Sequence, residues 1–98
     1  MLRYEGLDID LDRRSVQRQG QAVELTSTEF ELLVLLAATP GKVFSRDDIL
    51  ARLRGHAGQD IHSRAVDILV SRLRKKLEPL DSIHTLRNAG YLFAGVRA

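Results

Sequence analysis

An α+β fold is the class that this sequence predicts, because its strand-like and helix-like segments are grouped instead of alternating along the chain. Within residues 1–25, the segment 7–12 shows the two-residue alternation of a half-buried strand, and a second strand-like run is split by a turn. Residues 26–78 contain three segments with helical spacing, and residues 83–96 return to strand-like sequence around a turn. With 98 residues and 44% hydrophobic side chains, the chain fits one domain over residues 1–98.

The first 25 residues predict a small antiparallel sheet. In LDIDLD, residues 7–12, leucine or isoleucine alternates with aspartate, as expected for a strand with one buried face. The run SVQRQGQAVEL, residues 15–25, is interrupted by Gln19-Gly20, which suits a two-residue hairpin loop. The aspartates at 8, 10 and 12 are therefore assigned to the solvent face of the sheet.

Capping boxes open the first two predicted helices. Thr26 and Glu29 can satisfy each other's backbone amides, and the FELLVLLAA segment that follows is apolar almost all round, so its helix should be buried. Pro40-Gly41 stops it. Residues 45–48, SRDD, open a shorter helix, and Gly55 and Gly58 mark the loop after it. This helix should bury Ile49, Leu50 and Leu53.

The third helix, SRAVDILVSRLRKKL at residues 63–77, has two distinct faces. A rotation of about 100° per residue gathers one apolar set: Val66, Leu69, Val70, Leu73 and Leu77. The opposite side gathers Arg64, Ile68, Ser71, Arg72 and Lys75, with Arg74 and Lys76 on the flanks. A hairpin around Asn88-Ala89-Gly90 follows. Three helices followed by a hairpin form a winged-helix arrangement.

Positive charge is concentrated on this third helix. The chain has a net charge of +2, but residues 63–77 hold five basic residues against Asp67. A helix fits the major groove of DNA, where arginine can bond guanine and an aliphatic side chain can contact the thymine methyl group. The outward Ile68 among cations suits that use. An ordinary amphipathic helix with a solvated charged face is the alternative, and the neighbouring elements must decide.

Three stretches together are similar to a known family. TSTEFELLVLLAATPGKVFSRDDIL, then RAVDILVSRLRKKL, then TLRNAGYLF resemble the C-terminal effector domain of OmpR/PhoB-type response regulators, in the family's order and spacing. The resemblance implies a four-stranded N-terminal sheet, three helices and a C-terminal hairpin wing. It also implies sequence-specific binding of double-stranded DNA for transcription regulation, with the third helix in the major groove and the wing in the minor groove.

The resemblance also implies roles for individual residues. On or beside the recognition surface lie Arg64, Asp67, Ile68, Ser71, Arg72, Arg74 and Lys75, and the wing contributes Thr85 and Arg87. Arg72 is expected to contact a base, Arg74 and Thr85 to contact phosphates, and Arg87 to probe the minor groove. Where many family members have tryptophan, this chain has Arg54, which could bind a phosphate directly.

The family further implies partners. Its members commonly bind tandem direct repeats as a head-to-tail pair, so we expect two copies on DNA and a monomer in isolation. The loop at residues 55–62 is expected to engage RNA polymerase. The family's receiver domain is absent, so this chain is expected to be the DNA-binding half of a longer, cytoplasmic protein without a membrane segment.

Other functions find little support in the sequence. His56, His62 and His84 have no cysteine companions and no metal-ligand spacing, so neither a metal nor a cofactor is predicted. Asp47 and Asp48 suit the first turn of a helix better than acid–base work. No paired nucleophile and base is visible, so the chain is not expected to be an enzyme. The alternative is a winged-helix module that docks its basic helix on an acidic protein partner.

Overall fold

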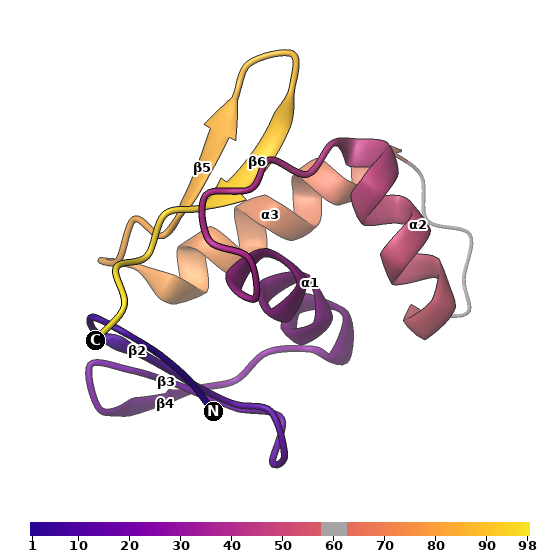
Figure 1. Ribbon diagram of the computed structural model, residues 1–98. Coiled ribbons are helices and arrows are strands. Elements are labelled where there is room, and N and C mark those ends of the chain that lie inside the picture. Colours follow the sequence, from indigo (N-terminus) through magenta and orange to yellow (C-terminus); the bar gives the residue numbers. More distant parts are fainter. Residues whose placement is uncertain (58–62) are drawn as a thin grey trace.

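The computed structural model describes residues 1–57 and 63–98, without the side chains of residues 54–64. Figure 1 shows a small sheet, a group of helices and a projecting hairpin in that order along the chain. The strands are β1 (Leu2–Tyr4), β2 (Leu7–Asp10), β3 (Ser15–Arg18), β4 (Gln21–Val23), β5 (Ile83–Leu86) and β6 (Gly90–Phe93). The helices are α1 (Ser27–Ala37), α2 (Arg46–Ala57) and α3 (Ser63–Leu77). The predicted winged-helix fold is confirmed.

The N-terminal sheet is an antiparallel meander in the order β1-β2-β3-β4. Its turn chemistry is as predicted: Gln19 and Gly20, both with positive φ of 52° and 80°, connect β3 to β4. Strand β2 is shorter than expected. It ends at Asp10, whose carboxylate accepts bonds from the next turn's amides, and Leu11 is 42% exposed. The prediction that Leu11 lies on the buried face is therefore wrong.

Strand β1 is paired on both sides. Besides β2, it contacts the C-terminal segment through a bridge between Tyr4 and Arg97, and directly after the strand the amide of Glu5 donates to the carbonyl of Val96 at 2.7 Å. The two chain ends consequently meet at the sheet, as Figure 1 shows.

The helices begin where the capping boxes predict. Thr26 Oγ1 accepts from the amide of Glu29, and the Glu29 carboxylate accepts from the amide of Thr26. Ser45 and Asp48 make the same exchange before α2. Helix α2 continues through Gly55 to Ala57, so the prediction that a loop begins at Gly55 is wrong. Two predicted boundaries agree with the structure: α1 ends at Ala37, before Pro40-Gly41, and α3 ends at Leu77.

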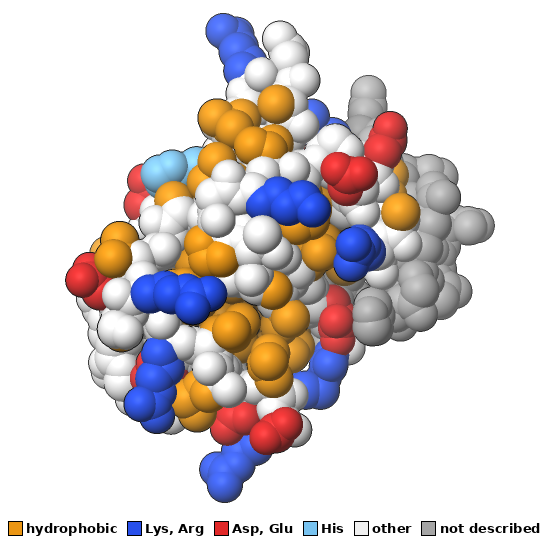
Figure 2. All heavy atoms as spheres, in the orientation of Figure 1, with side chains coloured by type: hydrophobic (Ala, Val, Ile, Leu, Met, Phe, Trp, Pro, Cys, Tyr) orange, Lys and Arg blue, Asp and Glu red, His pale blue; other side chains and the backbone are white. Residues whose placement is uncertain are grey.

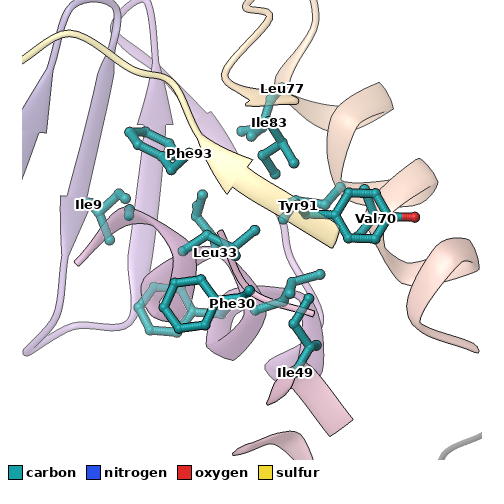
Figure 3. Close-up of a cluster of buried hydrophobic side chains, with 14 of the residues drawn as sticks. Ile9, Phe30, Leu33, Ile49, Val70, Leu77, Ile83, Tyr91 and Phe93 are labelled. Atoms are coloured by element: carbon teal, nitrogen blue, oxygen red, sulfur yellow. The ribbon is translucent and has the colours of Figure 1, made fainter. Parts of the chain in front are cut away.

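One hydrophobic core joins the sheet, the helices and the wing (Figure 3). Helix α1 lies at its centre, with Leu32, Leu33 and Leu36 fully buried. The wing is fastened to the segment before α2, because Phe44 and Tyr91 exchange backbone hydrogen bonds of 2.8 and 2.9 Å. Across the described part of the chain, no helix combines the length and apolarity that a membrane span requires.

Candidate nucleic-acid interface

Helix α3 presents its polar face outward. Ile68 is 51% exposed, and Ser71, Arg72 and Lys75 are also exposed. The opposite face is anchored in the core, since four side chains are at most 1% exposed: Val66, Val70, Leu73 and Leu77. Leu69 is half-buried at the border. The predicted division of α3 into a buried and an exposed face is confirmed.

The wing stands beside this helix and projects past it (Figure 1). Arg87 and Asn88 lie in the connection between β5 and β6, both exposed, and Asn88 has a positive φ of 63°. Figure 2 shows a Lys or Arg side chain at the tip of the hairpin, with hydrophobic side chains exposed below it. The hairpin therefore holds a cationic tip away from the body of the molecule, beside the outward face of α3.

Arg74 and Thr85 contact each other and so join α3 to the wing. The Arg74 guanidinium donates from Nε to the carbonyl of Ile83 at 3.0 Å and from Nη2 to the hydroxyl of Thr85. Its guanidinium also lies over the Tyr91 ring, 5.5 Å from the centroid. Arg74 is half-buried as a result. Both residues were expected to contact phosphates; in this structure they bond each other, and a phosphate contact stays a prediction.

Asp67 is bonded to two other elements. Its Oδ1 accepts from Arg46 Nε at 2.8 Å, at the start of α2, and from the Tyr91 hydroxyl on β6. The hydrogen bond from Tyr91 holds the pKa of Asp67 below its usual value, and Arg46 acts in the same direction against the effect of burial. Burial and the bond to Asp67 raise the pKa of Tyr91. The carboxylate is thus ionised and the phenol protonated near neutral pH.

The C-terminal end of α3 is bonded to α1 and to the N-terminal sheet. Lys76 donates to Glu29 Oε1 at 2.6 Å, and Arg18 on β3 donates to the Lys76 carbonyl at the same distance. Burial would raise the pKa of Glu29, but its bonds to Lys76 and Thr26 outweigh burial and lower that pKa. These bonds fix the position of α3 on α1 and the sheet, and so fix the position of its outward face.

Some of the expected site residues have no described side chain. The side chains of Arg54 and Arg64 are not described. Of the loop at 55–62 that was expected to engage RNA polymerase, residues 58–62 lie outside the described residues. Among the described residues, no group of three or more His, Cys, Asp or Glu side chains could hold a metal ion. His84 is exposed on the wing and lies 3.1 Å from the carbonyl of Asp81.

Arg46 and Tyr91 are the residues that sequence reasoning missed. They lie 21 and 24 residues from Asp67, so no local pattern connects the three. Both fall within the stretches that carry the family resemblance, and that was the signal available. Arg46 also lies over the Tyr91 ring, 5.6 Å from its centroid.

An outward basic helix anchored beside a projecting hairpin defines a winged-helix domain of the nucleic-acid-binding type. Residues 20–93 match the family model described as "Transcriptional regulatory protein, C terminal". The chain belongs to this family, the C-terminal domains of OmpR/PhoB-type response regulators.

Named relatives agree with this assignment. The chain is 40% identical over 98 residues to the probable transcriptional regulator ycf27 of Guillardia theta, covering 95% of this chain and 39% of the relative. It is 42% identical over 96 residues to the phosphate regulon transcriptional regulatory protein PhoB of Rhizobium meliloti, covering 93% of this chain and 41% of the relative. The chain thus spans about two fifths of these relatives.

A solved structure is also similar over nearly the whole chain. The DNA-binding domain of Klebsiella pneumoniae RstA, solved in complex with the RstA box, superposes with a TM-score of 0.79. The two chains are 43% identical, and the alignment covers 93% of each. The winged-helix assignment is therefore supported by both sequence and structure.

Proposed function

We propose that this domain binds double-stranded DNA sequence-specifically and regulates transcription in the cytoplasm as the output domain of a two-component response regulator. The observation that carries the proposal is the outward face of α3, where Ile68, Ser71, Arg72 and Lys75 are exposed together. The family membership and the DNA complex of the RstA domain support it.

In the proposed complex α3 enters the major groove. Arg72 is the base reader, since arginine can bond guanine O6 and N7 together. Ile68 contacts a thymine methyl group, Ser71 bonds a base edge or phosphate, and Lys75 binds a phosphate. The basic side chains supply the sequence-independent part of the affinity, and Arg72 and Ile68 the preference among sequences.

The wing enters the adjacent minor groove with Arg87. Its exposed position at the turn between β5 and β6 supports this role. Arg54 and Arg64 would add phosphate contacts. On tandem direct repeats two copies would bind head to tail, the free domain being a monomer, and residues 55–62 would contact RNA polymerase.

The alternative function is a protein-interaction module in which the same basic face of α3 binds an acidic partner. The two functions differ in sequence preference, because an acidic protein surface offers charge but no base edges. DNA binding through charge alone would be equally strong on random duplexes.

Selection of bound duplexes from a random pool tests the proposal directly. We expect one enriched sequence, present as two direct repeats, and a log–log salt dependence with a slope of about −4 to −5 per site for four to six neutralised phosphates. A pool that stays random after selection would reject sequence-specific binding and favour the acidic-partner module.

A further inference from the structure

Asp67 is chemically out of place on the proposed DNA-facing helix. It is the one acidic residue among five basic ones in residues 63–77, and its side chain is 45% exposed. A carboxylate is repelled by phosphates, although it can accept a bond from cytosine N4 in the major groove. Asp67 is therefore either a base reader or a residue that acts through other side chains.

The contacts of Asp67 favour the second role. One oxygen, Oδ1, already accepts from Arg46 Nε at 2.8 Å and from the Tyr91 hydroxyl. The two donors come from different elements, the first turn of α2 and strand β6. Asp67 thus connects the recognition helix to the wing and to α2 through charge-assisted hydrogen bonds, which are stronger than neutral ones.

Tyr91 extends this connection into the wing. Its side chain is only 4% exposed, and it is paired with Thr85 across the hairpin. Figure 3 shows its hydroxyl pointing out of the hydrophobic cluster. Because the ring is packed in the core, holding the hydroxyl at Asp67 also fixes β6 relative to α3.

A second anchor lies further along the same helix. Arg74 bonds Ile83 and Thr85 on β5, seven residues after Asp67. Seven residues make nearly two turns, so the two anchors lie on the same side of α3 and about 10 Å apart. Together with the backbone bonds between Phe44 and Tyr91, these two side-chain anchors hold the hairpin at a fixed angle to the helix.

We infer that Asp67 is a positioning residue for DNA recognition, which sets the angle of the wing so that Arg87 and Arg72 reach one duplex together. This inference rests on the proposed function. Asp67 itself makes no base contact, and its effect on DNA affinity passes through the wing.

A double-mutant cycle between Asp67 and Arg87 tests the inference, using the duplex obtained by selection. Arg87→Ala should weaken binding about tenfold in the wild-type background, the loss typical of one arginine contact. In the Asp67→Ala background the same change should weaken binding less than about threefold, because Arg87 on a misplaced wing no longer makes its full contact with the DNA. The matched control is Ser71→Ala, an exposed α3 residue outside these bonds, for which Arg87→Ala should keep its full effect.

A second variant guards against loss of folding. Tyr91→Phe removes only the hydroxyl that joins Asp67 to the wing, and it should reduce the effect of Arg87→Ala as Asp67→Ala does. Thermal unfolding of each variant shows whether the domain is folded. A merely structural role would lower the melting temperature without coupling Asp67 to Arg87.

Two results would overturn the inference. Additive effects of Asp67→Ala and Arg87→Ala in folded protein would show that Asp67 does not act through the wing. A changed preference at a single base pair, with the full effect of Arg87→Ala retained, would make Asp67 a base reader. If the wild-type domain does not distinguish the selected duplex from a scrambled one, the proposed function fails and the inference fails with it.

Discussion

Gly90 carries a specific steric demand, and replacing it with alanine should detach the wing from the body of the domain. A Cβ at this position would lie 2.0 Å from the carbonyl oxygen of Phe44 and 2.7 Å from its carbonyl carbon. Contacts below 3.0 Å are essentially absent for real Cβ atoms. The backbone must therefore shift by about 1 Å, which disrupts the reciprocal bonds between Phe44 and Tyr91.

The cost of this change has two parts. Losing two backbone hydrogen bonds costs about 1–3 kcal/mol in net terms. The φ of 140° at Gly90 is a conformation that alanine adopts only with strain, worth about 1–3 kcal/mol more. Gly90→Ala should therefore lower the free energy of unfolding by about 2–6 kcal/mol in a urea titration.

Gly20→Ala is the matched control. Gly20 also has a positive φ, of 80°, but nothing lies within 4 Å of an added Cβ. Its replacement should cost only about 1–2 kcal/mol of backbone strain. If Gly90→Ala destabilises the domain no more than Gly20→Ala, the steric argument for the wing attachment is refuted.

Three further changes separate stability from binding. Leu73→Ala should lower the free energy of unfolding by about 2–5 kcal/mol in urea, because it leaves a cavity in the core; a loss below about 1 kcal/mol would contradict the burial of this side chain. Ile68→Ala should alter stability by less than about 0.5 kcal/mol yet weaken binding to the selected duplex, and unchanged binding would remove Ile68 from the interface. Glu29→Gln should destabilise the domain at pH 7, because the lowered pKa of Glu29 means that its carboxylate stabilises the fold above its ordinary pKa of 4.5. That difference from wild type should shrink as the pH falls below 4.5 and Glu29 becomes protonated, and a constant difference down to pH 3 would contradict the assigned ion pair with Lys76.

The parts of the fold that could be predicted depend on residues close together in the sequence. The box of Thr26 with Glu29 and the turn at Gln19-Gly20 each lie within four residues, and both are present in the structure. The buried face of α3 follows from helical spacing alone. Local patterns suffice here because each fixes its own backbone.

The features that were missed depend on contacts between distant segments. Strand β1 has only three residues, and its pairing with the C-terminal segment joins opposite ends of the chain. The extension of α2 through Gly55 opposes the usual helix-breaking tendency of glycine. The bonds from Asp67 to Arg46 and Tyr91 exist only once three elements have met.

The sequence predicted which side chains of the candidate site are exposed, but not the hydrogen bonds that some of them make to other elements. Helical periodicity predicted that Ile68 and Arg72 point outward, and they do. The family resemblance placed Asp67 and Arg74 beside them as DNA contacts, and the period of a helix carries no information about which residues of a neighbouring hairpin could bond them instead. Their internal partners could only come from the tertiary structure.

Binding of Arg72→Ala to the selected duplex, and to duplexes altered at one base pair at a time, tests the central claim most directly. If α3 reads bases through Arg72, the variant should bind the selected duplex about 5- to 150-fold more weakly and should lose its preference at one base pair. Equal weakening on the selected and scrambled duplexes would contradict the claim and make Arg72 a phosphate contact only.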